Sequence, residues 1–358
     1  GQANPSQRRS RGTLIIGNDF HTRYERIVRL KAETGEVEER RLEHRNGEAR
    51  AFYASLPEPA LVGIESTGYT LWFAELMNEL GHELAVGDAA KIRASETRKQ
   101  KHDRRDAWHM MELLAPGKFP RIGLPSAAER DVRVLLNHRH FLVEMRTRAK
   151  NGLLALALSR NRCQGRKLWS GAGQQALQAL PLGEAPARRR QDRLRLVAEL
   201  KGWIGEREER LEQEVEKRPD AQRLQTHPGV GPLTVLATGV VLGPVQRFAN
   251  GRKVASYLGL IRSEHSSGGR QQFGHLTKQS NRLLRFLLIE AAQSACRYDP
   301  ELQQDYKRLA FRHGWAKARG AVARKLAIRL YIMQRDQIDY AEFVRRGPYA
   351  GRPGVALV

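Results

Sequence analysis

Short apolar runs alternate with amphipathic segments from Thr13 to about Gly117. The runs and alternating stretches predict five strands, at residues 14–20, 26–32, 37–44, 60–65 and 84–86. Helical periodicity appears in between and predicts helices at residues 46–56 and 69–80. A meander of three strands followed by helix, strand, helix and strand is the order of an RNase H-like fold. The pattern therefore predicts an α/β domain of that class.

The pattern becomes helical after Pro125. Residues 126–160 and 187–217 are rich in Leu, Arg and Glu, and residues 165–186 interrupt them with Gly, Gln and Pro. The two stretches predict an antiparallel helical hairpin or coiled coil. A mainly helical region with Gly-rich turns follows, from about residue 221 to residue 340.

A chain of 358 residues is expected to form two or three domains. The predicted parts are a flexible basic arm at 1–12, an RNase H-like domain at 13–124, a helical coiled-coil segment at 125–220, a mainly helical domain at 221–340 and an irregular tail at 341–358. The best candidate for a membrane span, residues 228–245, holds three prolines and four glycines. A buried helix or a helix hairpin is favoured there.

The net charge of the chain limits the classes of partner that it is expected to bind. Lys and Arg total 62 against 39 Asp and Glu, which gives a net charge of +23 and a pI near 10.6. Such a balance predicts a polyanionic partner, either nucleic acid or an anionic membrane surface. The basic residues are spread along the chain and are not clustered beside an apolar face, so a membrane-surface role is the least favoured.

The first residues of the chain and its two cysteines indicate the cellular compartment in which the protein is expected. Residues 1–12 lack the apolar run of a secretory signal. Cys163 and Cys296 are too few for a disulfide framework or a structural zinc site. We therefore expect a soluble, cytoplasmic protein.

Four acidic residues lie where a metal-dependent nuclease would need them. Asp19 lies at the end of the first predicted strand, Glu65 ends the fourth, and Asp103 and Asp106 are three residues apart at a helix start. Converging carboxylates repel one another unless divalent cations neutralise them, and oxygen ligands favour Mg²⁺ or Mn²⁺. Two such ions about 4 Å apart would clamp a phosphodiester.

Each acid taken alone also has a plain structural explanation. Most acids are solvated surface groups, Asp103 could pair with the arginines beside it, and Asp106 could serve as an N-terminal helix acid. Glu65 is harder to explain in this way, because it ends a run that is otherwise fit for burial. The ordered set on a matching strand pattern favours metal binding.

A second group of motifs lies in the C-terminal half. In the sequence His-Pro-Gly-Val-Gly-Pro at 227–232, Gly229 and Gly231 resemble the turn of a helix-hairpin-helix, where backbone N–H groups hold a DNA phosphate. Further along, Ser266-Ser267 precede two glycines, which let the backbone approach a phosphate. Four cations could hold that phosphate: Arg270, Lys278, Arg282 and Arg285. A Pro/Gly helix start explains the first motif too, and a Ser/Gly surface loop followed by a helix with a basic face is the explanation that residue chemistry alone favours for the second.

Taken together, these motifs resemble one family, the DEDD-type insertion-sequence transposases that are bridge-RNA-guided recombinases (the IS-one-ten family). Gly-Asn-Asp19, Ile-Glu65-Ser-Thr-Gly and Asp103-Arg-Arg-Asp106-Ala resemble its RuvC-like metal tetrad in order and type. Four further motifs resemble the family's C-terminal transposase domain: His-Pro-Gly-Val-Gly-Pro, Ala-Ser-Tyr-Leu-Gly-Leu, Ser-Ser267-Gly and Thr-Lys-Gln-Ser-Asn-Arg-Leu-Leu-Arg. The resemblance covers roughly residues 13–335.

The resemblance implies an activity and its partners. It implies that Ser267 is the nucleophile of a covalent 5′-phosphoserine intermediate, with Ser266 as the nearby rival, and that the RuvC-like domain supplies Mg²⁺ or Mn²⁺. It also implies a tetramer, built as a dimer of dimers, that binds donor DNA, target DNA and a noncoding bridge RNA. The expected location is the bacterial cytoplasm, with association with the nucleoid during activity. Two departures are Asn18 before Asp19 and Gln279-Ser280-Asn281, where glycine commonly precedes the Asn or Asp. Neither removes a ligand.

The same residues are also compatible with two other functions. A RuvC-like nuclease or junction resolvase would use the same four acids but hydrolyse DNA with water, and the serine would then be structural. A non-enzymatic nucleic-acid scaffold would bind without needing Mg²⁺, and the intact set of four acids argues against it. The target sequences of the DNA and of the RNA do not follow from the protein sequence.

Overall fold

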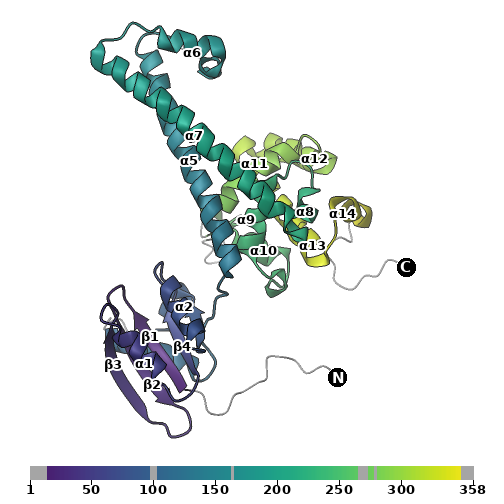
Figure 1. The fold of residues 1–358 in the computed structure, drawn as a ribbon. Helices are drawn as coiled ribbons and strands as arrows, with labels where there is room; N and C mark the ends of the chain where they lie inside the picture. The colour runs from purple at the N-terminus through teal and green to yellow at the C-terminus, as the bar shows by residue number, and fades with distance from the viewer. Residues whose placement is uncertain (1–13, 97–102, 163–164, 265–272, 278–279, 348–358) are drawn as a thin grey trace. The chain divides into compact units, whose positions relative to one another are not determined.

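The computed structural model describes residues 14–96, 103–162, 165–264, 273–277 and 280–347. The chain forms two compact units, which meet in sequence between Leu124 and Pro125 (Figure 1). Unit 1 is a mixed α/β structure, and unit 2 is mainly helical.

A five-stranded mixed sheet forms the centre of unit 1. Its order is β3-β2-β1-β4-β5, with β1–β2 and β2–β3 antiparallel and with β1–β4 and β4–β5 parallel. The strands are β1 (Leu14–Phe20), β2 (Tyr24–Lys31), β3 (Val37–Glu43), β4 (Ala60–Glu65) and β5 (Glu83–Gly87). The predicted order of a meander followed by helix, strand, helix and strand is confirmed.

Helices cover both faces of this sheet. The helices are α1 (Glu48–Ala54), α2 (Leu71–Glu79), α3 (Ala89–Ser95) and α4 (Asp103–Leu114). Ile16 and Ile64 pack with Tyr53 of α1 and Phe73 of α2 on one face. Because side chains alternate along a strand, the neighbouring strand residues face the other way, where α4 packs against Ile15 and the hydrophobic side of β2.

The contact between α4 and the sheet is unusually close at Gly17 of β1. A Cβ atom at Gly17 would overlap the carbonyl oxygen of Ala107 and the backbone nitrogen of Met111. Gly63, the register partner of Gly17 on β4, faces the side chain of Leu114 in the same manner. The two glycines therefore let the helix backbone lie directly on the strands.

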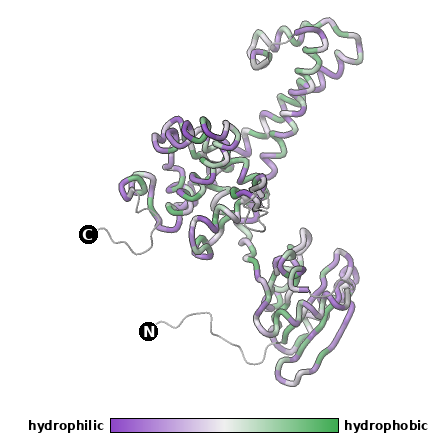
Figure 2. Tube along the Cα trace, turned by 180° about the vertical axis from the view of Figure 1, so that it is seen from behind, coloured by the Kyte–Doolittle hydropathy of each residue, from purple (hydrophilic) through white to green (hydrophobic). Residues whose placement is uncertain are grey.

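Unit 2 begins with a long antiparallel hairpin of α5 (Ala127–Leu158) and α7 (Glu184–Glu216). Leu142 packs with Leu200 and Ile204 at its middle. Figure 2 shows hydrophobic positions recurring between hydrophilic ones along the hairpin, as expected of two amphipathic helices. The predicted hairpin is observed. The segment that connects its two helices contains the 3-10 helix η2 (Gly165–Trp169) and α6 (Gly171–Gln178).

The remaining elements form the helical body of unit 2. They are α8 (Pro219–Gln225), α9 (Pro232–Leu242), η3 (Val245–Arg247), α10 (Gly251–Tyr257), β6 (Arg262–Glu264), β7 (Phe273–Leu276), α11 (Arg282–Ala295), α12 (Pro300–His313), α13 (Trp315–Asp336) and α14 (Tyr340–Arg346). Most of α9 and much of α13 are buried, as expected of core helices. None of the helices in the described part of the chain has the length and apolarity that a membrane crossing requires.

Most element boundaries shift by one to three residues from those predicted, and two of the shifts in unit 2 have a clear local cause. Helix α7 begins at Glu184 and not at residue 187, because Pro186 lies in its first turn, where a missing N–H breaks no helical hydrogen bond. Residues 341–346, predicted to belong to an irregular tail, are part of α14. The side chain of Asp339 accepts a hydrogen bond from the Glu342 backbone at its start, and Glu342 bonds Arg345 and Arg346 at helical spacing.

A buried histidine ties α14 to the turn before α9. His227 is 1% exposed, its ring lies 4.6 Å from that of Tyr340, and its Nδ1 donates to the Pro228 carbonyl oxygen at 3.0 Å. Within the described structure its Nε2 has no hydrogen-bond partner. The hydroxyl of Tyr340 donates to Asp299 at 2.7 Å. Burial lowers the pKa of His227 to about 4.

We expect Gly17→Ala to destabilise unit 1 by about 1–3 kcal/mol or more, because the added methyl group meets backbone atoms of α4 that cannot move without lifting the helix. Denaturation of the full chain followed by fluorescence would measure this change. Gly68→Ala is the matched control, since no atom of the described structure lies within 4 Å of the position that its Cβ would take. Equal stability of the two variants would contradict the close packing of α4.

Acid should destabilise unit 2 through His227. The folded protein holds this imidazole neutral down to a pKa of about 4, whereas the unfolded chain binds the proton near 6.5. The unfolded state thus binds more protons between these values, and stability falls as pH is lowered through this window by up to roughly 3 kcal/mol. His227→Phe keeps an aromatic ring beside Tyr340 but cannot titrate. Its free energy of unfolding should depend less on pH from 6.5 to 4, and an unchanged dependence would exclude His227 as the cause.

Candidate functional site

Asp19 and Glu65 lie side by side at one edge of the sheet. Asn18 of β1 pairs in parallel register with Ile64 of β4, so the next residue on each strand occupies neighbouring positions. Alternation places Asp19 on the same face as Gly17, and Glu65 on the same face as Gly63. Both acids therefore face the side of the sheet that α4 covers, at the carboxyl ends of two parallel strands.

Each of these two acids has a basic neighbour that was not among the residues predicted from the sequence. The Nε2 of His21 lies 2.9 Å from Oδ2 of Asp19, whose side chain is 14% exposed. The Nη2 of Arg93 on α3 lies 3.7 Å from Oε1 of Glu65, whose side chain is 35% exposed. His21 follows Asp19 by only two residues, which is a usable signal. Arg93 is distant in sequence, and only the packing of α3 reveals it.

Helix α4 carries the other two predicted acids. Asp103 is its first residue, and Asp106 lies one turn further and is half-buried. Ala107, whose carbonyl oxygen approaches Gly17, follows Asp106 directly. The side chain of Asp103 lies outside the described structure. Among the described side chains no group of three or more potential metal ligands is found. The strand register brings Asp19 and Glu65 side by side.

A buried polar cluster fixes β1 immediately before Asp19. The Nδ2 of Asn18 donates to Oε2 of Glu25 at 2.6 Å and to the hydroxyl of Tyr53 at 3.2 Å. Asn18 and Glu25 are fully buried, on the face opposite to Asp19. Burial raises the pKa of Tyr53 well above its ordinary value, so its hydroxyl stays protonated. Asn18, a departure from the family pattern, thus links two strands and one helix, β1, β2 and α1, at this point.

The candidate nucleophile lies outside the described residues. Ser266, Ser267 and Arg270 follow β6 and precede β7 in the chain, and Lys278 lies just beyond β7. The described parts of β6 and β7 pair antiparallel, with Arg262 opposite Leu276.

Two of the C-terminal motifs meet in the fold. Gly259 has a positive φ of 63°, and a Cβ atom there would lie 2.9 Å from Oγ of Ser280. That same hydroxyl accepts a hydrogen bond from Nη1 of Arg285 at 2.5 Å. Arg282, at the start of α11, has a side chain that is 87% exposed, with Nη2 3.9 Å from Oε1 of Glu144 on α5. Of these two predicted phosphate-binding arginines, Arg285 is held in place and Arg282 extends into solvent.

The two glycines before α9 differ in their surroundings. Gly229 has a φ of 78°, and a Cβ atom there would overlap the backbone of Ala295 at the end of α11. Chain reversal and tight packing thus already require this glycine. Gly231 precedes Pro232 at the α9 N-terminus, and no atom of the described structure lies within 4 Å of its missing Cβ. Of the two, Gly231 is the one that leaves space for a ligand.

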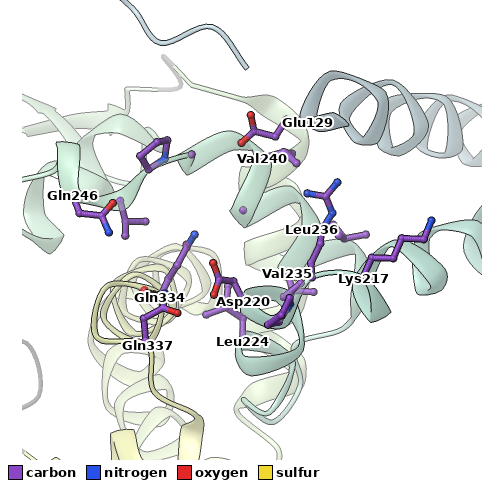
Figure 3. A pocket seen from close by; sticks show the side chains of 17 residues that line it. Glu129, Lys217, Asp220, Leu224, Val235, Leu236, Val240, Gln246, Gln334 and Gln337 are labelled. Atoms are coloured by element: carbon purple, nitrogen blue, oxygen red, sulfur yellow. Dashed lines mark hydrogen bonds between the residues drawn. The ribbon is translucent and has the colours of Figure 1, made fainter. Parts of the chain in front are cut away.

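A pocket of about 580 Å³ lies elsewhere in unit 2 (Figure 3). Apolar side chains such as Leu224 and Leu236 and polar ones such as Asp220 and Gln334 point toward it from α8, α9 and α13. None of the site residues predicted from the sequence lines this pocket. It is separate from both groups of motifs.

Comparison with known proteins gives matches along both units. A DEDD transposase model of the IS110 type matches residues 16–159, and a model described as the transposase IS116/IS110/IS902 family matches residues 221–307. The first match contains all four predicted acids, and the second contains β6, β7 and α11.

Similar proteins cover most of the chain. A probable family 20 transposase of Pseudomonas aeruginosa is 30% identical over 262 residues, which are 71% of this chain and 76% of the relative. The transposase for insertion sequence element IS1111A of Coxiella burnetii is 28% identical over 68% of this chain and 69% of its own. The transposase for IS1328 of Yersinia enterocolitica is 25% identical over 68% and 72%. The chain belongs to the IS116/IS110/IS902 family of transposases, which cut and rejoin DNA.

Proposed function

We propose that unit 1 is an RNase H-like, RuvC-like domain that binds divalent metal ions and that unit 2 supplies a serine nucleophile for DNA recombination. The observation that carries this proposal is the position of Asp19 and Glu65 on neighbouring parallel strands, facing the helix that carries Asp103 and Asp106. The sheet order and the family match of residues 16–159 support the same assignment.

The residues present fit a hard divalent cation. Asp19 and Glu65 offer oxygen donors on one face, and the exposed fraction of Glu65 leaves that carboxylate open to a ligand. With Asp103 and Asp106 they would hold Mg²⁺ or Mn²⁺. Bound there, the ions would neutralise phosphate oxygens and lower the pKa of an attacking hydroxyl. Arg93 places a positive charge 3.7 Å from Glu65, which offsets part of the repulsion between two carboxylates on adjacent strands.

Ser267 is the proposed nucleophile. Its hydroxyl oxygen attacks the phosphorus of a DNA strand, loses its proton and displaces the 3′ oxygen, which leaves the 5′ phosphate joined to the serine. Attack by another 3′ hydroxyl then reverses the reaction and releases the serine. Because each step exchanges one phosphate ester for another, the strands are rejoined without ATP. Arg270, Lys278, Arg282 and Arg285 are proposed to hold the phosphate.

A noncoding bridge RNA and a tetrameric assembly complete the proposal. The family resemblance and the net charge of +23 support two polyanions bound together. Base pairing would then select the DNA, while the protein holds the RNA through its backbone. The α5–α7 hairpin carries none of the proposed catalytic residues, and we assign it to contacts between subunits.

Asp19→Asn and Glu65→Gln should each lower strand cleavage by roughly a hundredfold or more, because each removes a charge that stabilises the reacting phosphate. Cleavage of DNA that carries the ends of the element would be measured with and without Mg²⁺, and DNA binding would be measured in parallel. Glu79→Gln is the control, because Glu79 pairs with Arg50 at the protein surface away from the strand ends.

Binding should persist in both site variants, whereas chelation of metal by EDTA should stop cleavage by the wild type. Full cleavage in EDTA would exclude the metal site. Loss of binding and cleavage together would instead indicate a folding defect, which thermal unfolding would detect.

Ser267→Ala should abolish cleavage while leaving folding and DNA binding unchanged, since a single hydroxyl typically contributes only about 1 kcal/mol to stability. Ser263→Ala on β6 is the matched control. Mass spectrometry of trapped wild-type reactions should find a nucleotide on the peptide that contains Ser267. A nucleotide on Ser266 would move the assignment by one residue. Cleavage by Ser267→Ala in Mg²⁺ without any protein adduct would identify water as the nucleophile, and the protein as a nuclease.

A further inference from the structure

Two large aromatic side chains are exposed where α12 meets α13. Phe311 is 94% exposed and Trp315 is 68% exposed. Every residue from 311 to 317 is exposed, although seven consecutive positions at the junction of two helices would ordinarily include a buried one. Large apolar side chains grouped at the surface usually mark a binding site. We call Phe311, Trp315 and the cations within one helical turn of them the aromatic corner.

The backbone fixes the positions from which the two aromatic side chains extend. Gly314 alone separates α12 from α13, and its φ of 81° is a conformation that favours glycine. The ring of Trp315 lies edge-on to the half-buried ring of Tyr306, with the ring centres 6.0 Å apart. This contact orients the indole and leaves most of it open to solvent, so the corner is built without burying its aromatic faces.

The corner is strongly basic. No Asp or Glu occurs in the sequence from Tyr306 to Arg335. Lys307 and Arg308 precede Phe311 by one turn of α12, and Arg319 follows Trp315 by one turn of α13. Arg312 and Lys317 are exposed between them. Only Arg308 among these five cations has an ion-pair partner in the described structure, which is Asp305.

We propose that the aromatic corner binds an unpaired DNA strand, with bases stacked on Phe311 and Trp315 and phosphates on the surrounding cations. Aromatic rings beside cations are the common means of holding single strands, because every base has a face that can stack. A duplex keeps its bases stacked on one another and offers no face to the rings. A second copy of the corner would bring like charges together, which disfavours self-association.

Apart from Lys307, this surface lies beyond the stretches that match transposase models, which end at residue 307. The inference rests on the DNA cutting that the family performs, and does not depend on the metal ions, on Ser267 or on RNA. Cut strands must leave their duplex before they are rejoined elsewhere. A site that holds one of them would keep it from rejoining its original partner.

Binding of fluorescent oligothymidylate to the full chain at physiological salt tests the proposal. Phe311→Ala and Trp315→Ala should each weaken this binding about tenfold, the scale of one stacked base. Phe311→Tyr and Trp315→Phe keep a ring and should bind as the wild type does. Because Phe311 is almost fully exposed, its loss should leave thermal unfolding unchanged.

Trp203 provides the matched control. It is 44% exposed on α7, and its neighbours at helical spacing are Glu199, Leu200, Glu206 and Arg207. Arg207 pairs with Glu206, so the excess of unpaired cations that surrounds the corner is missing there. Trp203→Ala should leave the affinity for oligothymidylate unchanged.

Four results would overturn the proposal. Wild-type affinity of both alanine variants would exclude stacking at the corner. An equal loss of affinity for a duplex of the same length would make it a duplex contact. A larger loss for oligouridylate than for oligothymidylate would make RNA the occupant. A change of oligomeric state in the alanine variants, with DNA affinity retained, would assign the corner to contacts between copies of the chain.

Discussion

The close contact between α4 and the backbone of β1 at Gly17 is the constraint on which unit 1 depends. A side chain at this point would force the helix away from the sheet, because its Cβ would overlap backbone atoms of Ala107 and Met111. The first turn of α4 carries Asp103 and Asp106, so the same shift would move two of the four candidate ligands away from Asp19 and Glu65. Metal ligation tolerates little displacement, since oxygen–metal distances vary by only a few tenths of an ångström. Packing and chemistry are therefore coupled through one glycine.

Unit 2 relies on a different principle, a charged network that is buried with its partners. Arg329 of α13 is almost fully buried and bonds Asp299 and Glu301 at the start of α12. Asp299 also accepts the hydroxyl of Tyr340, which brings in α14. Hydrogen bonding and Arg329 lower the pKa of Asp299 even though burial alone would raise it. Removing one member would leave a buried charge without a partner, which costs more than the intact network contributes.

The strand order of unit 1 follows from the sequence because β1 and β4 contain apolar runs suited to buried strands, and the Thr34-Gly35 turn marks β2 and β3 as a pair. The predicted bounds of the strand at 60–65 match β4 residue for residue, since Pro59 and Ser66 flank an uninterrupted pattern. The positions of Asp19 and Glu65 follow from the same pattern, once the two strands are taken as neighbours. Alternation along each strand then places both carboxylates on one face.

Other parts of the site do not follow from the pattern. Arg93 reaches Glu65, and Asn18 bonds Glu25 and Tyr53, through strand register and helix packing that periodicity does not encode. The exposure of Phe311 could not be predicted from the sequence either, because an apolar residue in a helical pattern is ordinarily assigned to the core. Ser267 and its flanking residues lie outside the described structure, so its role remains the proposal that the motif supports.

The pairing of β1 with β4 has a consequence for the newly made chain. Asp19 and Glu65 are 46 residues apart in sequence and become neighbours only when the parallel ladder forms, after the intervening meander and α1 have folded. Docking of α4 requires a further 49 residues, up to Leu114. A ribosome-bound chain that ends before α4 lacks Asp103 and Asp106, two of the four candidate ligands. The candidate site would therefore be complete only after the whole of unit 1 has emerged.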